Sequence, residues 1–198
     1  DVVWLPTVSR YLVVWNHAVD LDLVSFEPTD YDIFCRFVEA DGTPNPTDTY
    51  IVEDTAVYNA GSPQVAYNPA NEEVFIVWTD NYDSATNGEQ IQGIIMDPSP
   101  VSAPTWTTSE FTISASGLGV VDDVYPDVSC DGWDYLVVYQ QVDSAPPHCD
   151  IRGVLVDSSG NPGSPFDIAP GDGDSERPAV SYLSLNYYVV WSDHEYDS

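Results

Sequence analysis

The sequence predicts an all-β fold in which one four-stranded antiparallel unit occurs three times in full and a fourth time in part. Three observations support this prediction. An apolar run ending in an aromatic residue occurs four times, and a short Pro-x-Val element precedes each run. Helical periodicity is nowhere sustained, because 16 prolines and 12 glycines interrupt every candidate helix.

The first two strands of each unit are the clearest part of the repeat. The expected first strands are Pro6–Ser9, Pro63–Ala66, Pro126–Ser129 and Pro178–Ser181. The expected second strands are Tyr11–Trp15, Val74–Trp78, Tyr135–Tyr139 and Tyr187–Trp191. Successive prolines are 57, 63 and 52 residues apart. Four recurrences of two linked elements indicate a tandem repeat.

Three of the four copies continue into two more strands. The expected third strands are Asp32–Glu39, Gln90–Asp97 and Asp150–Asp157. Turn dipeptides that tolerate positive φ follow two of them, Asp41-Gly42 and Ser159-Gly160. The expected fourth strands are Tyr50–Val52, Phe111–Ile113 and Phe166–Ile168. Each full unit is therefore four short strands joined by turns.

Units of this kind favour propeller-like blades. The second strand is almost continuously apolar, as expected for a strand buried on both faces between neighbouring blades. A β-sandwich is the main alternative, although it does not explain the faithful recurrence of the unit. We expect one repeat domain over residues 1–198, with blades at about 6–62, 63–125 and 126–177 and a partial blade at 178–198.

The repeat resembles tandem units of secreted prokaryotic β-propeller-type proteins. The residues that carry the likeness in the third copy are Pro126, Val128, Tyr135–Tyr139, Asp150-Ile151, Gly153, Val156-Asp157 and Gly160. The likeness implies an extracellular propeller from a longer adhesive or surface-exposed chain, with no assigned reaction. This sequence departs from the pattern at Cys35, where glycine is usual, and at Tyr139, where tryptophan is usual.

The charge balance restricts the possible partners. There are 33 acidic residues against four arginines, and the formal net charge is -29. Such a surface repels phosphate backbones and anionic lipids, so neither nucleic acid nor a membrane surface is an expected partner. The longest apolar runs have about five residues, too few to insert into a membrane. Because the chain begins at Asp1 without methionine, we expect a secreted or cell-surface protein that is either a fragment or has lost a leader.

Acidic residues that follow the second strands suggest a calcium site. The candidate ligands are Asp20, Asp22, Asp80 and Asp83. Clustered carboxylate oxygens suit Ca²⁺, although no copy matches the twelve-residue calcium loop. The alternative is a solvated acidic rim. No cofactor other than calcium is expected.

The three cysteines do not form a recognisable motif. Cys130 and Cys149 are expected at opposite ends of one blade, too far apart for a disulfide. Cys35 is expected in mid-strand as a small buried hydrophobe. No spacing of cysteine or histidine indicates zinc. The sequence leaves the state of the three thiols open.

These features predict no enzyme, because no carboxylate pair or nucleophile stands out among so many acids. The main functional hypothesis is an extracellular structural or adhesive module, which assembles with copies of itself or with further blades through exposed strand edges into a filament. The alternative is a propeller module that binds carbohydrate or another ligand. Trp4, Trp106 and Trp133 lie outside the repeat register and are the candidates for a contact surface with glycans.

Overall fold

The computed structural model describes residues 1–21, 28–54, 59–81, 88–114, 121–143, 148–171 and 173–194. All regular elements in these ranges are β-strands. In the part of the chain that is described, no helix is long and apolar enough to cross a membrane.

The strands form three sheets in chain order. The first sheet, blade 1, contains β1 (Val2–Leu5), β2 (Arg10–Leu21), β3 (Pro28–Glu39) and β4 (Pro44–Glu53). Blade 2 contains β5 (Ala60–Asn68), β6 (Glu73–Asp80), β7 (Gln90–Asp97), β8 (Thr105–Trp106) and β9 (Phe111–Thr112). Blade 3 contains β10 (Val121–Cys130), β11 (Tyr135–Asp143), β12 (Cys149–Val156) and β13 (Phe166–Ala169). A last hairpin, the partial blade, contains β14 (Asp174–Leu183) and β15 (Asn186–His194).

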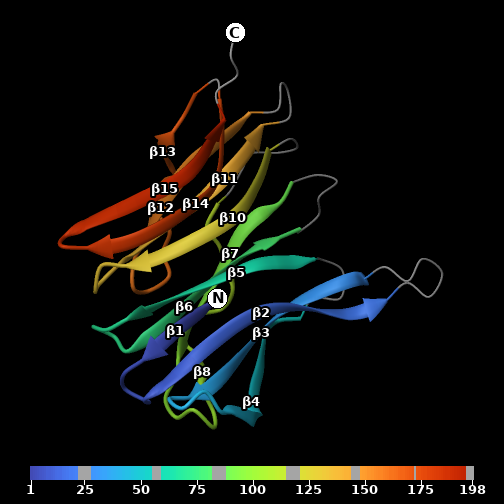
Figure 1. Cartoon of the computed structure of the whole chain (residues 1–198), viewed down its shortest axis with the longest axis vertical. Helices are drawn as coiled ribbons and strands as arrows, with labels where there is room; N and C mark the ends of the chain where they lie inside the picture. Colours follow the sequence, from blue (N-terminus) through green and yellow to red (C-terminus); the bar gives the residue numbers. More distant parts are fainter. Residues whose placement is uncertain are drawn as a thin grey trace.

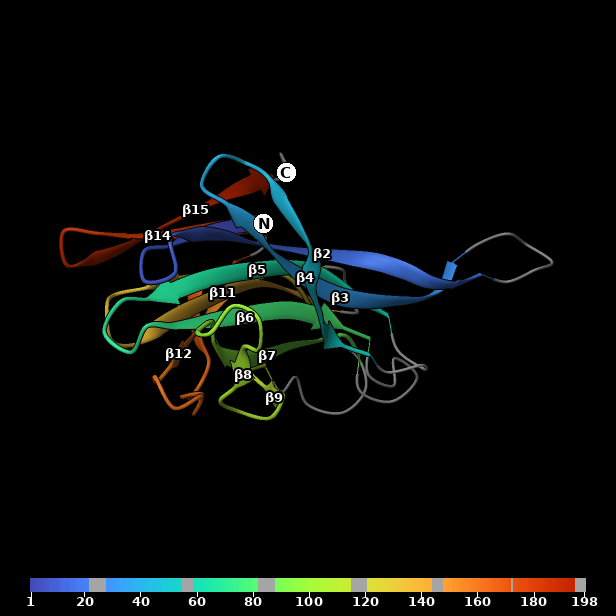
Figure 2. The ribbon, with the colours of Figure 1, turned by 90° about the horizontal axis from the view of Figure 1, so that it is seen from below.

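The blades follow one another along the long axis of the molecule, from blade 1 to the partial blade (Figure 1). The second strands β2, β6 and β11 run in a similar direction through the stack when it is seen from below (Figure 2). The partial blade joins the sheet of blade 3 through a single parallel pair, Cys149 with Asp174. The predicted fold class, all-β with three complete propeller-like blades and one partial blade, is confirmed.

Strand register shows which residues are equivalent between blades. Val65, Val128 and Val180 each lie opposite the middle residue of the following apolar run. In blade 1 that place belongs to Val2, which lies opposite Val13. The expected first strand at residues 6–9 is therefore wrong. Those residues form the β1–β2 turn, because the strand that pairs with β2 has already ended at Leu5.

The core lies between the blades rather than inside any one of them. Alternate side chains of a second strand point to opposite faces, so those of β6 reach the blade on either side. Val74, Ile76 and Trp78 pack with blade 1, and Phe75 and Val77 pack with blade 3. All five are fully buried. Burial on both faces explains why this strand has no polar alternation.

A close approach at the middle of the third strand requires a small residue. A Cβ atom on Gly93 would lie 2.6 Å from Phe75 Cε2, and one on Gly153 would lie 2.8 Å from Phe166 Cζ. Cys35 holds the equivalent place in blade 1, where it lies opposite Val14 and Tyr50. It is fully buried, as expected, and burial raises the pKa of its thiol to about 12.

A bulge in the first strand recurs from blade to blade. In β5, β10 and β14 the register shifts at the proline and at the residue before it. The residues before the prolines, Ser62, Tyr125 and Arg177, have φ of 52°, 52° and 50°. Left-handed backbone is unfavourable for such side chains. The proline thus marks a bulge inside the strand and not the beginning of the strand.

Side chains of the preceding blade stabilise two of these bulges. Thr79 Oγ1 accepts a hydrogen bond from the backbone N–H of Tyr125 at 3.2 Å. One blade further on, Gln140 Oε1 accepts one from the N–H of Arg177, also at 3.2 Å. Thr79 and Gln140 occupy the same position, directly after the aromatic end of the second strand. The bulge therefore turns its N–H toward the previous blade, where a polar side chain receives it.

Candidate functional site

A cleft of about 530 Å³ lies where the first strands begin and the second strands end. It is lined by residues of all three complete blades: Asn16, Tyr31, Asn59, Ala60, Gly61, Ser62, Thr79, Glu89, Asp122, Val124, Tyr125, Gln140 and Val142. Its walls thus come from segments far apart in the sequence. Their convergence follows from the stacking of the blades.

The repeat itself supplies part of this lining. Asn16, Thr79 and Gln140 each follow the aromatic residue that ends an apolar run, so they are equivalent positions. A change from apolar to polar at that position marks the point where each second strand leaves the core. The stack brings the three polar side chains to one cleft.

Two acidic residues, Glu89 and Asp122, are part of the cleft lining. The backbone N–H of Glu89 donates a hydrogen bond to Asp122 Oδ1 at 3.0 Å. Burial, together with the neighbouring charge of Asp122, raises the pKa of Glu89. A Cβ atom on Gly88 would overlap the carbonyl oxygen of Val121, and Gly88 has φ of 70°, so this close approach requires glycine.

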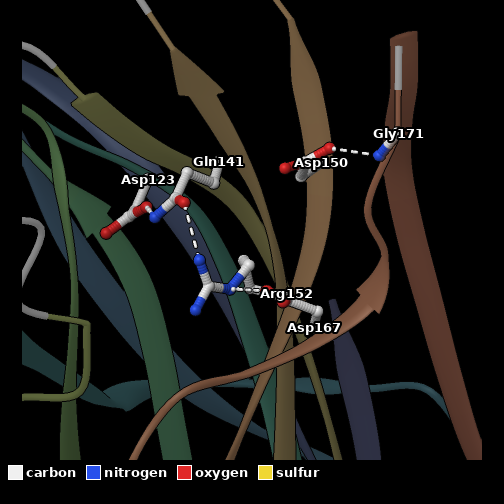
Figure 3. Close-up of polar contacts among 6 residues, drawn as sticks. All are labelled: Asp123, Gln141, Asp150, Arg152, Asp167 and Gly171. Carbon is white, nitrogen blue, oxygen red and sulfur yellow. Dashed lines mark hydrogen bonds and ion pairs between the residues drawn. The ribbon is translucent and has the colours of Figure 1, made fainter. Parts of the chain in front are cut away.

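A line of polar contacts crosses blade 3 (Figure 3). Gln141 Nε2 donates to Asp123 Oδ1 at 3.0 Å, and Arg152 Nη1 donates to Gln141 Oε1 at 2.9 Å. Arg152 Nε also forms an ion pair with Asp167 Oδ1 at 3.0 Å. These contacts connect β10, beside Asp122, to the outer strand β13. Nearer the partial blade, Asp150 Oδ1 accepts a hydrogen bond from the N–H of Gly171 at 3.2 Å.

A second hollow, the inner groove, continues from the cleft along the first strands. Its volume is about 390 Å³, and its lining is Ser62, Gln64, Tyr125, Pro126, Asp127, Arg177, Pro178 and Ala179. Ser62 and Tyr125 belong to both hollows. The guanidinium carbon of Arg177 lies 4.4 Å from the centre of the Tyr125 ring, as in a cation–π pair. The groove therefore combines an aromatic face with a cation.

The proposed calcium ligands are not brought together by any described contact. Asp80 is 2% exposed at the end of β6. Burial, followed by the charge of Glu110, raises its pKa to about 6. The side chain of Asp20, and all of Asp22 and Asp83, lie outside the described residues. Among the side chains that the structure describes, no group of three or more His, Cys, Asp or Glu could hold a metal ion. Calcium binding stays a prediction.

The tryptophans chosen as a contact surface lie away from the cleft lining. Trp133 is 73% exposed in the β10–β11 turn. Trp4 contacts Tyr11 with the two rings tilted by 59°, and Trp106 packs against the core between blades 1 and 2. All three cysteines are free thiols in the structure.

Sequence reasoning missed the cleft residues Glu89, Asp122, Tyr31 and Tyr125. Two signals were present. The first was the polar residue after each aromatic, and the second was the large side chain directly before two of the repeated prolines. Neither signal indicates a cleft until the register places these positions at one end of the stack.

Comparisons with known proteins relate this fold to carbohydrate-active enzymes. No protein-family model and no curated protein matches the sequence. The endo-arabinase of Bacteroides thetaiotaomicron is similar in structure, with a TM-score of 0.58 and 9% identity over 98% of this chain and 71% of that one. The Penicillium chrysogenum α-L-arabinanase, solved with arabinobiose, gives 0.61 and 15% over 96% and 57%. The microbial sialidase Hz136 gives 0.59 and 13% over 98% and 45%.

These similarities define the class of fold: a β-propeller of the kind found in family 43 glycoside hydrolases. The chain spans about half to two thirds of the length of several of these enzymes. The expectation that the protein is not an enzyme is contradicted, because several solved structures similar to this chain are arabinanases or other glycoside hydrolases. It was based on the absence of a carboxylate pair that stands out in the sequence. Folding brings two acidic residues of the cleft lining together, because the backbone N–H of Glu89 donates to Asp122 Oδ1. The comparisons favour the carbohydrate alternative and give no support to the adhesive one.

Proposed function

We propose that this chain is the carbohydrate-binding part of an extracellular propeller, and that the cleft across blades 1 to 3 holds the glycan. The observation that carries the proposal is the composition of the cleft. It combines two tyrosine rings, Tyr31 and Tyr125, with polar side chains from all three blades. Sugars present apolar ring faces and many hydroxyl groups, so they are recognised by aromatic faces together with hydrogen-bonding side chains.

Three further facts support the proposal. The structural neighbours act on carbohydrates, as their names state, and one was solved with arabinobiose. The acidic surface is unsuited to nucleic acid and to anionic membranes. The motif likeness to secreted repeat proteins favours an extracellular location, although the neighbours share the fold and not the motif.

Calorimetric titration with a panel of arabinan, xylan and other plant and microbial oligosaccharides tests this proposal. At least one of them is expected to bind, and Tyr31→Ala is expected to weaken that binding about tenfold through loss of ring stacking. Trp133→Ala is the matched control, because this exposed aromatic residue lies in the turn at the other end of β10. The proposal fails if no glycan binds, or if the two variants weaken binding equally.

The carboxyl pair in the cleft favours a second candidate function, glycoside hydrolysis. A carboxylic acid with a raised pKa can protonate the leaving oxygen while a nearby carboxylate acts as base or nucleophile. Glu89 has the raised pKa and Asp122 is its neighbour. With a bound glycan in hand, Glu89→Gln is expected to abolish reducing-sugar release while binding persists. Turnover that survives in both Glu89→Gln and Asp122→Asn contradicts this assignment.

A further inference from the structure

We infer that the inner groove selects glycans carrying a carboxylate, such as a uronic acid unit, and that Arg177 binds that group. The inference rests on the proposed carbohydrate function and specifies its ligand class. It begins from the scarcity of cations, since the chain has four arginines and no lysine against 33 acids. In such a chain, the placement of each arginine is informative.

The other three arginines have partners within the fold. Arg10 forms an ion pair with Glu39 at 2.8 Å. Arg152 forms one with Asp167 at 3.0 Å. Arg36 Nε donates to Thr49 Oγ1 at 2.6 Å, and its guanidinium lies over the Trp15 ring.

Arg177 differs from them. Within the described ranges its guanidinium makes no hydrogen bond and no ion pair, and its one contact of note is the Tyr125 ring, 4.4 Å away. The donors of this guanidinium therefore remain available in the groove. A planar guanidinium matches a carboxylate in a two-point hydrogen-bonded geometry.

The backbone of both residues is held by the preceding blade. Both have left-handed backbone, with φ of 50° at Arg177 and 52° at Tyr125. Gln140 fixes the N–H of Arg177, and its own side-chain nitrogen donates to Cys149 Sγ at 3.2 Å. Thr79 fixes the N–H of Tyr125. The same bulge occurs at Ser62, so it belongs to the repeat, and at Tyr125 and Arg177 it places two large side chains in the groove lining.

The carboxyl group nearest to this pair in the groove lining is already occupied. Asp127 Oδ2 accepts a hydrogen bond from the N–H of Val180 at 2.6 Å, and its Oδ1 accepts one from the N–H of Val128 at 2.9 Å. Burial raises the pKa of this carboxyl group. Asp127 thus connects blade 3 to the partial blade through its hydrogen bonds, and the guanidinium of Arg177 is available to an anion from outside the protein.

The position of the groove explains how a glycan reaches Arg177. Because the cleft and the groove share Ser62 and Tyr125, a chain lying in the cleft can extend over Tyr125. Its next sugar ring would then stack on Tyr125 and present an acidic substituent to Arg177. The net charge of -29 disfavours a polyanion, so we expect one carboxylate in an otherwise neutral oligosaccharide.

The test uses calorimetric titration with a xylo-oligosaccharide bearing one glucuronic acid and with the same compound after reduction of the carboxyl group. The native chain is expected to bind the acid about tenfold more tightly than the reduced form. Arg177→Gln should remove this preference while it retains binding of the neutral compound. Arg10→Gln, which loses an arginine already paired with Glu39, should keep the preference.

The outcomes separate the inference from the function on which it rests. If neither compound nor any neutral glycan binds, the proposed function fails, and the inference fails with it. If the native chain binds both forms equally, or if Arg177→Gln weakens both equally, the inference fails and the carbohydrate function stands. Tighter binding of a sulfated analogue than of the uronate would overturn the assignment to a carboxylate.

Discussion

The strands β6 and β15 carry the same apolar motif but lie in different surroundings. Trp78 and Val77 of β6 are both 0% exposed, whereas their counterparts Trp191 and Val190 of β15 are 38% and 64% exposed. The reason is that β6 has a blade on each side. Among the described strands, β15 has blade 3 on one side and no further blade on the other (Figure 1).

This difference shows that the motif specifies blade stacking and does not by itself produce burial. The side chains of β15 that point away from blade 3, Tyr188 and Val190, match Phe75 and Val77, which β6 buries against blade 3. Hydrophobic stabilisation follows the area removed from water. A side chain at the same position of the motif therefore stabilises the protein strongly in β6 and weakly in β15.

The largest expected contrast is between Phe75→Ala and Tyr188→Ala. Phe75 is fully buried and packs against Phe111 and Tyr135, so its truncation should lower the free energy of unfolding by about 3–5 kcal/mol. Tyr188 is 54% exposed, and its truncation should cost less than about 0.5 kcal/mol. Urea unfolding of both variants measures the contrast. Equal losses would show that the outer face of β15 is covered in solution.

A smaller effect is expected from overpacking in blade 2. Gly93→Ala places a Cβ atom against Phe75 and Ile113 in the filled core and should cost about 1–3 kcal/mol. Gly61→Ala is the control, because a Cβ atom there meets no atom within 4 Å. Thermal unfolding compares the two variants. A Gly93 variant as stable as the Gly61 variant would mean that the blades separate easily.

The smallest expected effect is a pH-dependent one at the acidic residue two positions after the aromatic. The pKa of Asp80 is raised to about 6, so the folded state holds its proton more tightly than the unfolded state does. Its contribution to stability is present below about pH 4 and is lost as the pH rises to about 6. Asp80→Asn should therefore raise stability at pH 7 by about 1–2 kcal/mol and have little effect at pH 4.

Asp193→Asn is the matched control for this change. It removes one negative charge at the equivalent, exposed position of β15. Urea unfolding of both variants at pH 4 and at pH 7 separates local burial from the general relief of negative charge. Equal stabilisation by both variants at pH 7 would show that net charge, and not burial of Asp80, is the cause.

The pattern of the sequence was sufficient for the second and third strands, because a fully apolar run flanked by turn residues allows few alternatives. It failed at residues 6–9, where a proline and a valine have the spacing of the Pro-x-Val element but lie in a turn. Proline fixes only its own φ and does not specify which residues pair with the next strand. Only the observed strand register shows that residues 6–9 lie outside the sheet.

The candidate site was even harder to predict from the sequence than the first strand of blade 1. Glu89 and Asp122 are two of 33 acidic residues, and nothing in their local sequence separates them from the rest. Their partnership depends on the contact between the start of β10 and the segment before β7. Tyr125 and Arg177 are 52 positions apart in the sequence and meet only because successive blades place equivalent bulges side by side.

The sequence alone determined that this protein is a stack of small antiparallel sheets, because apolar periodicity and turn chemistry are local properties that each copy repeats. Only the tertiary structure decided which carboxyl groups share a cleft and which arginine keeps its guanidinium available. Those properties depend on distances between blades, and such distances arise from packing that no single copy encodes.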